Sequence, residues 1–235
     1  MTQTFRILWE AMKDFWEELF LLALMNIVTM LLAIPVVTFP PALAGLWNTA
    51  NLVAKGKGIH WSDYFGGFRR YFWKAWGLAL LNILVALIVL TNLRFYAQDV
   101  VPFDVSPTVS LWIRSFFVAT AALWLITQIY TMALLLEQED QRLRLALRNA
   151  VVLFIANPGF TIVLALLLLI LTAISTLVPV LWAMVTWGFF AVLCNKAVLH
   201  LLQPFRERML AEAEGEAGEE EKNEKQESSH SDDSQ

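Results

Sequence analysis

Residues 19–54 read LFLLALMNIVTMLLAIPVVTFPPALAGLWNTANLVA and contain no charged side chain. About 20 apolar residues are enough for a helix to cross the hydrocarbon of a bilayer, so this run is longer than one crossing needs. Pro35, Pro40 and Pro41 divide it, because proline removes a backbone donor and interrupts a helix. We expect a first span at about 19–39. A second, less apolar helix from Pro41 to Ala54 is expected to lie at the membrane interface or against the helix bundle.

Four more apolar runs, at about 75–93, 111–136, 160–177 and 179–199, are each long enough for one crossing. Hydrophobic residues make up 58% of the 235-residue chain, whereas a soluble domain has about 45–50%. The excess lies in these uncharged runs. The sequence therefore predicts an all-α, polytopic membrane protein with about five transmembrane helices, in a membrane domain that covers residues 1–205.

Three other segments, at 4–18, 62–74 and 139–155, carry apolar and charged residues on opposite helical faces. In the second of them, Phe65, Phe68 and Phe72 share one face, and Arg70 and Lys74 share the other. Aromatic residues toward lipid and basic groups toward water are typical of helices that lie in the membrane plane. We expect amphipathic in-plane helices at these positions.

The charges are unevenly distributed along the chain. The net charge of −4 combines −8 in residues 211–235 with about +4 in the rest. Residues 211–235 lack aromatic and large aliphatic side chains and cannot form a core, so we expect 206–235 to be an acidic, disordered cytoplasmic tail. The remainder is too weakly basic and too apolar to indicate nucleic-acid binding.

The lysines and arginines predict the orientation in the membrane, because cytoplasmic segments are enriched in them. With five spans, segments 40–74, 137–159 and 200–235 hold twelve of them, and the segments on the other side hold three. We therefore expect a bacterial cytoplasmic-membrane protein with its N-terminus outside and its C-terminus in the cytoplasm.

The stretch from Asn26 to Trp76 resembles the YesL-like family of bacterial membrane proteins. The residues that carry the resemblance are Asn26, Ile34-Pro35-Val36-Val37-Thr38, Pro41-Ala42, Ala44, Asp63-Tyr64-Phe65, Phe68-Arg69, Phe72 and Lys74-Ala75. The chain departs from the family pattern at Phe39-Pro40, where a small residue often precedes the second proline. The resemblance implies five or six spans and, for some members, association with oligosaccharide uptake systems. It implies no catalytic residue.

Five residues inside or beside the spans are candidates for a functional site: Asn26, Pro35, Thr38, Pro41 and Asn82. Proline frees backbone carbonyls at membrane depth, and broken helices of this kind form binding sites in some transporters. The alternative is a simple turn in which Thr38 caps the next helix. An amide in hydrocarbon needs a partner, so we expect Asn26 and Asn82 to bond across helices. As an alternative, they line a polar path with Thr29, Thr127 and Gln128.

A second candidate is a cytoplasmic basic face, formed by Arg69, Arg70, Lys74, Arg144 and Arg148. Basic groups near an anionic membrane each contribute about 1 kcal/mol of attraction. This face is expected to bind a partner protein or a lipid phosphate, or to serve orientation alone.

No residue pattern predicts a catalytic, cofactor or metal site, since His60, His200 and His230 are scattered and Cys194 is the single cysteine. No charged residue lies at the middle of a span, which disfavours an ion-coupled transporter. The leading hypothesis is a non-enzymatic membrane protein accessory to a carbohydrate permease. The alternative is a stand-alone transporter or channel for a small solute. Either form is compatible with a homo-oligomer in the lipid bilayer.

Overall fold

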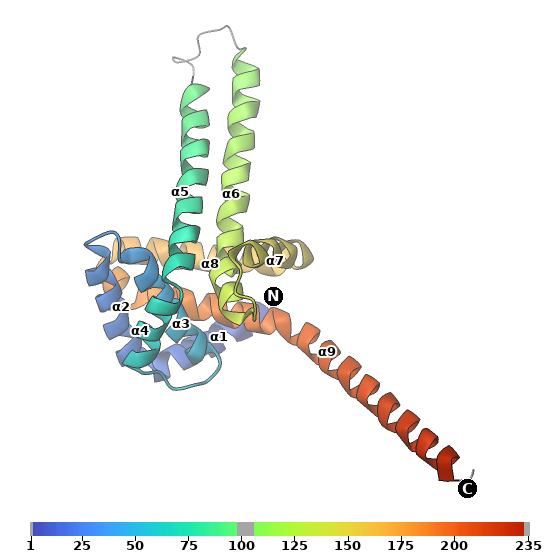
Figure 1. Ribbon diagram of the computed structural model, residues 1–235. Helices are drawn as coiled ribbons and strands as arrows, with labels where there is room; N and C mark the ends of the chain where they lie inside the picture. Colours follow the sequence, from blue (N-terminus) through green and yellow to red (C-terminus); the bar gives the residue numbers. More distant parts are fainter. Residues whose placement is uncertain (1, 98–105, 233–235) are drawn as a thin grey trace. The chain divides into compact units, whose positions relative to one another are not determined.

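The computed structural model describes residues 2–97 and 106–232, with side chains for 6–97, 106–209 and 211. Every regular element in this part of the chain is a helix, which confirms the all-α fold class (Figure 1). The helices are α1 (Thr2–Glu17), α2 (Leu19–Ala33), α3 (Phe39–Ala54), α4 (Trp61–Arg70), α5 (Phe72–Phe95), α6 (Pro107–Glu137), α7 (Leu143–Ala156), α8 (Pro158–Leu177), the π-helix η1 (Trp182–Thr186) and α9 (Trp187–Asp232). The chain divides into two compact units, Met1–Val198 and Leu199–Gln235, which are described separately.

Four helices are long and apolar enough to cross a membrane: Phe72–Phe95, Pro107–Glu137, Pro158–Leu177 and Trp182–Met209. They coincide with the last four predicted spans. A fifth crossing requires α1 and α2 together, which are bent by 85° at their junction. The chain is therefore a polytopic α-helical membrane protein with four or five candidate spans among the described residues.

The predicted first span at 19–39 is wrong in its extent, because α2 ends at Ala33. Its 15 residues rise about 22 Å, less than the roughly 30 Å of hydrocarbon that a straight span must cross. Ile34 still has helical backbone, with φ −56° and ψ −48°, and the chain turns after it, at Pro35 and Val36. Val36 then adopts φ 55°, a conformation that β-branched residues rarely take.

Helix α3 lies inside the first unit and not at its surface. It begins with Pro40 and Pro41 in its first turn, where their missing N–H groups cost nothing. Ala42, Leu46 and Ala50 are fully buried. Of the two positions expected for this helix, the structure shows the one against the bundle.

Two glycines allow α3 and α4 to approach each other closely. A Cβ atom on Gly45 would lie 2.7 Å from the backbone oxygen of Tyr64, and one on Gly67 would lie 2.6 Å from Cβ of Asn48. The side chain of Asn48 also donates to the backbone oxygen of Asp63 at 3.0 Å. The short helix α4 is therefore fixed on α3 by close contact and a hydrogen bond.

Asn26 joins α2 to the irregular start of the last long helix. Its Nδ2 donates to the carbonyl oxygens of Trp182 at 2.9 Å and Ala183 at 2.8 Å, and its Oδ1 accepts from the N–H of Gly188 at 3.1 Å. A π-helix interrupts the regular hydrogen-bond ladder, and a buried side chain inserted there can bond the displaced groups. The prediction that Asn26 bonds across helices is confirmed.

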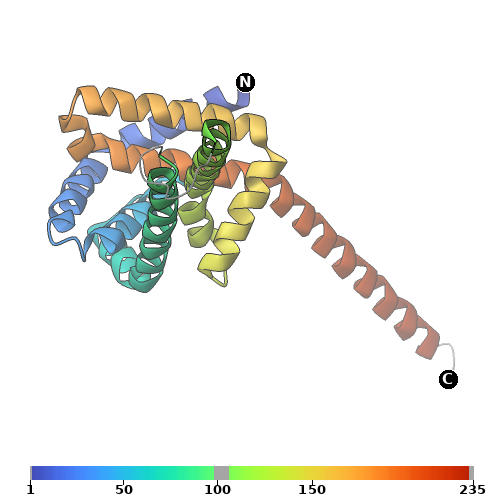
Figure 2. The ribbon, with the colours of Figure 1, turned by 90° about the horizontal axis from the view of Figure 1, so that it is seen from above.

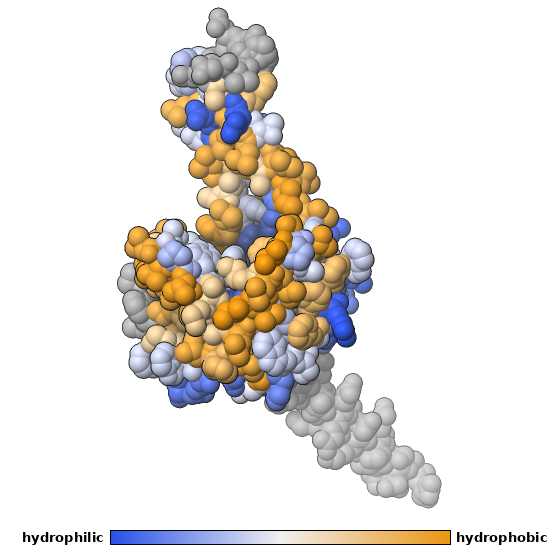
Figure 3. All heavy atoms as spheres, turned by 90° about the vertical axis from the view of Figure 1, so that its left-hand side faces the viewer, coloured by the Kyte–Doolittle hydropathy of each residue, from blue (hydrophilic) through white to orange (hydrophobic). Residues whose placement is uncertain are grey.

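Helices α5 and α6 lie side by side and form what we call the α5–α6 hairpin (Figure 1). Only 6% of the apolar 18-residue stretch of each of these two helices is buried inside the protein. In Trp182–Met209, 56% of the corresponding stretch is buried. The visible side of this hairpin is mostly hydrophobic (Figure 3). Its apolar surface therefore faces lipid or another protein.

Helix α8 and the first part of α9 form a second apolar pair, which runs across the direction of the α5–α6 hairpin (Figures 1 and 2). Length and composition qualify both pairs for crossing a membrane. Helices that cross a flat bilayer run roughly along its one normal, whereas these two pairs run in different directions. The membrane crossing of each pair is therefore a separate question.

The second unit differs from the disordered tail that the sequence predicts, because α9 continues to Asp232. The residues after Pro204 include nine Glu and three Ala and contain no further proline. These residue types lose little side-chain freedom in a helix. A segment without a core can therefore still take helical backbone.

The glycine contacts predict opposite effects for two neighbouring substitutions. Gly67→Ala places a Cβ 2.6 Å from Asn48 and should destabilise the protein by about 1–3 kcal/mol. Gly66→Ala meets no atom within 4 Å and should stabilise α4 by up to about 1 kcal/mol. Thermal unfolding in detergent, followed by circular dichroism, measures both. Equal shifts in the two variants would contradict the close contact of α3 with α4.

Candidate functional site

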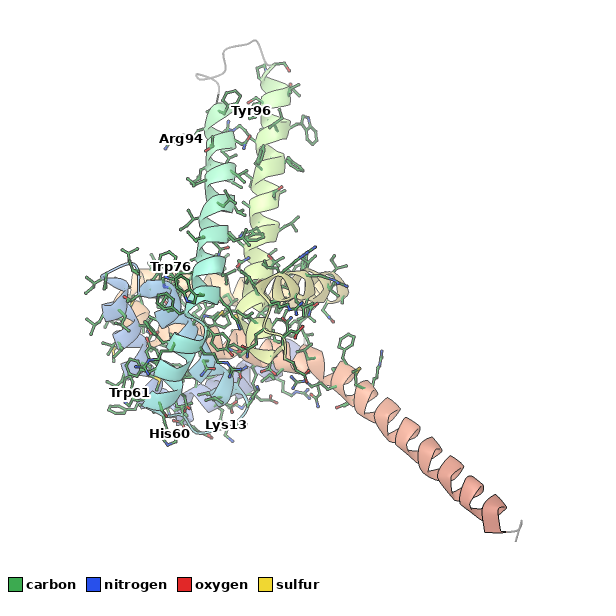
Figure 4. All side chains as sticks on the ribbon, in the orientation of Figure 1. Lys13, His60, Trp61, Trp76, Arg94 and Tyr96 are labelled. Atoms are coloured by element: carbon green, nitrogen blue, oxygen red, sulfur yellow. The ribbon has the colours of Figure 1, made fainter. Side chains whose placement is uncertain are left out.

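The turn between α2 and α3 is fixed to the start of α5. Trp76 Nε1 donates to the carbonyl oxygen of Val37 at 3.0 Å, and Trp76 lies at the base of the α5–α6 hairpin (Figure 4). Beside this contact is a pocket of about 450 Å³, lined by the turn, α3, α5 and α6. A pocket of this size is within the range that holds small ligands or bulky side chains.

Two amide side chains are the polar lining of this mostly apolar pocket. Asn82 of α5 accepts from Trp124 Nε1 of α6 at 2.8 Å, which confirms that Asn82 bonds across helices. Gln128 of α6 has a buried Nε2 that makes no hydrogen bond within the described part of the chain. Both amides also line a second pocket of about 460 Å³ between α5 and α6. The Asn82 oxygen is thus already used, and Gln128 Nε2 is a donor in this lining that still lacks an acceptor within the described residues.

The structure separates the five predicted candidates. Asn82 lines the pocket, whereas Asn26 lies at η1 and Pro35 is exposed on the turn. Pro41 is buried in the first turn of α3. Thr38 is the N-cap residue of α3, as predicted, and its carbonyl oxygen accepts from Ala42 N–H at 2.9 Å, but its hydroxyl donates back to the carbonyl oxygen of Leu32 and makes no capping bond.

The predicted polar path is present only in part. Gln128 lies beside Asn82 in the pocket lining. Thr29 instead bonds the hydroxyl of Tyr64 at 2.8 Å, and Thr127 bonds the carbonyl oxygen of Trp124 in its own helix at 2.7 Å. Burial raises the pKa of Tyr64, so this hydroxyl stays protonated at neutral pH.

A second polar cluster, which the sequence does not predict, connects α3, α6 and α9. Lys55 Nζ lies 2.6 Å from Glu137 Oε1, and the Glu137 side chain is only 4% exposed. Asn51 Nδ2 donates to Glu137 Oε1 at 2.7 Å and to Asn195 Oδ1 at 3.0 Å. Partners this far apart in sequence leave no local pattern by which they could be recognised.

The five residues of the predicted basic face are accessible. Arg69, Arg70, Arg144 and Arg148 are exposed and Lys74 is half-buried. None of the five makes an ion pair with a carboxylate within the residues that the structure describes. Arg70, the last residue of α4, and Lys74, in the first turn of α5, lie 5.6 Å and 5.4 Å from the centroid of the Tyr71 ring.

The described residues contain no group of three or more His, Cys, Asp or Glu side chains arranged for a metal ion. Cys194 is buried with a free thiol. His60 is used locally, since its backbone N–H donates to Asp63 Oδ2 at 2.9 Å and closes the start of α4. The chemistry that this arrangement supports is binding through amides and cations.

Comparison with known proteins finds no match: no protein family, no curated protein and no solved structure is similar to this chain. The resemblance to the YesL-like family therefore depends on the residues quoted above.

The buried ion pair predicts a large effect at Glu137. Glu137→Gln removes the charge that faces Lys55 and should destabilise the protein by about 1–3 kcal/mol. The control is Asp140→Asn, because the Asp140–Arg142 pair is 3.5 Å long and exposed on both sides and should contribute little. Thermal unfolding in detergent compares them. A Glu137→Gln protein as stable as Asp140→Asn would exclude a structural role for the buried pair.

Proposed function

We propose that this chain is a non-enzymatic accessory subunit of the bacterial cytoplasmic membrane, which binds a partner membrane protein through the α5–α6 hairpin. The observation that carries the proposal is that the side-chain Nε2 of Gln128 has no hydrogen-bond partner among the described residues. Gln128 lies on a hairpin in which only 6% of the apolar 18-residue stretch of each helix is buried. Lipid tails can cover the apolar surface, but they offer no acceptor for the amide.

A transmembrane helix of a partner supplies what lipid lacks. Hydrogen bonds between helices in membranes contribute about 0.6–2 kcal/mol each, and such interfaces favour small residues that let helices approach closely. The second pocket, beside Gln128, is lined partly by Ala86 and Ala121. A helix that presents a carbonyl or hydroxyl oxygen there would pair the amide and cover the alanines.

The choice of partner rests on the YesL-like resemblance of residues 26–76. Some members of that family are associated with oligosaccharide uptake, so a permease subunit of such a system is the proposed partner. The absence of charged residues from the middle of the spans supports an accessory role over ion-coupled transport by this chain alone.

Removing the amide should weaken partner binding and leave the fold intact. We expect Gln128→Leu to lower recovery of a permease subunit with the tagged protein by about threefold to tenfold, after crosslinking in intact cells. Thr120→Val is the matched control, because Thr120 is exposed on the same helix and bonds only the carbonyl oxygen of Phe116. Recovery is measured by quantitative mass spectrometry.

Three results would contradict the accessory role. The first is equal recovery of the permease with both variants. The second is recovery of a self-associated species alone. The third is solute flux in vesicles that contain only this protein, which would establish the stand-alone transporter instead.

The proposed topology places the N-terminus outside and the C-terminus in the cytoplasm, with the turn between α8 and η1 outside. A membrane-impermeant thiol reagent added to intact cells should label Val180→Cys and Ser106→Cys but not Asp140→Cys. Cys194 is buried, so background from the native thiol should be low. Labelling of Ser106→Cys without Val180→Cys would show that α8 and α9 do not both cross the membrane.

A further inference from the structure

Tyr71 organises two cations at the point where the chain passes from α4 into α5. Its ring is 2% exposed, and it separates Arg70, the last residue of α4, from the first turn of α5. Arg70 Cζ lies 5.6 Å from the centroid of this ring and Lys74 Nζ lies 5.4 Å from it. Cations attracted by the same ring are held near each other in spite of their like charge.

Gln141, between α6 and α7, fixes this arrangement from another part of the chain. Its Nε2 donates to the hydroxyl of Tyr71 at 3.0 Å, and its Oε1 accepts from Lys74 Nζ at 2.9 Å. Gln141 has φ 41°, a left-handed conformation that is uncommon for residues other than glycine. Unusual backbone of this kind persists only where its surroundings hold it, and it is found often at binding sites.

Arg70 and Lys74 make no ion pair with a carboxylate among the described residues. Glu137, whose charge acts on Tyr71, is bonded to Lys55 and Asn51. Asp140 is paired with Arg142. Two fixed cations without a counter-ion form a site for an anion.

The position at the start of α5 indicates which anion. Trp73, which directly precedes Lys74, is 82% exposed, as is typical of tryptophan at a membrane–water boundary. Lys74 is followed by the uncharged run from Ala75 to Leu93. The cations therefore lie where an apolar span begins, at the depth of lipid headgroups.

We infer that Arg70 and Lys74, positioned by Tyr71 and Gln141, bind the phosphate of an anionic phospholipid. The start of α7 lies close to α5, because a Cβ on Gly77 would be 3.4 Å from Leu143 Cδ2. The bound lipid would connect the start of α5 to the α6–α7 junction. This inference does not depend on the proposed partner.

The test measures lipid retention by the full-length protein in a neutral detergent. Phosphatidylglycerol or phosphatidylcholine is titrated, and bound lipid is counted by native mass spectrometry. We expect a preference for phosphatidylglycerol, which the double variant Arg70→Gln with Lys74→Gln weakens at least about tenfold. Arg94→Gln, a cation at the other end of α5, should bind as the wild type does.

Two further variants separate binding from folding. Exchanging the two cations, Arg70→Lys with Lys74→Arg, should retain most of the preference because the charge is kept. Gln141→Asn tolerates left-handed backbone but is one methylene shorter, so it should weaken phosphatidylglycerol binding while the melting temperature stays close to that of the wild type.

Three outcomes would overturn the inference. They are equal retention of the two lipids, a double variant that binds phosphatidylglycerol as well as Arg94→Gln does, and displacement of the lipid by inorganic phosphate at a similar concentration. The last would identify a site for free phosphate and not for lipid.

Discussion

The first unit depends on one constraint of the membrane interior, namely that each buried polar group must find its partner within the protein. Asn26 meets this constraint at the most irregular point of the fold. Its amide bonds two carbonyl oxygens and one N–H group around η1, where the backbone ladder is interrupted. The short helix α2 is thereby fixed to the long C-terminal helix, and α3 is enclosed in the interior beside them.

The two apolar pairs differ in how much of their apolar surface the protein itself buries. Around η1 the hydroxyls of Ser175 and Thr186 bond each other at 2.7 Å, whereas the buried Nε1 of Trp187 has no hydrogen-bond partner among the described residues. The α5–α6 hairpin buries little apolar surface and leaves Gln128 unpaired. The hairpin, which buries only 6% of the apolar stretch of each of its helices, has the composition of a surface that another molecule covers. Gln128 and Lys74 lie in this hairpin, whereas the four arginines of the basic face lie on α4 and α7.

Much of the helical architecture could be predicted, because the length and apolarity of one continuous stretch of sequence are enough to indicate a span. Four of the five expected spans coincide with helices of the structure. The first does not, since apolarity continues through Ile34–Thr38 although the backbone turns there. Composition also cannot distinguish a solvated coil from a solvated helix, which is why the acidic tail was expected to be disordered.

The candidate site was predictable only in its separate residues. Asn82 and the basic residues could be selected because polar groups are conspicuous in an apolar chain. The contacts between distant residues could not be predicted. Lys55 contacts Glu137, and Lys74 contacts Gln141, across long stretches of sequence without a shared periodic pattern. The role of Gln141 depends on a backbone angle, which the sequence does not display.

The bonds of Asn26 also have a consequence for how the protein is made. Its partners follow it in the chain by 156 to 162 residues. At a synthesis rate of about 5–20 residues per second, α2 must wait roughly 8–30 s before Trp182 and Gly188 leave the ribosome. During that interval a polar amide lies in a helix too short to span the bilayer. The native bonds of Asn26 can therefore form only after the last long helix has been synthesised.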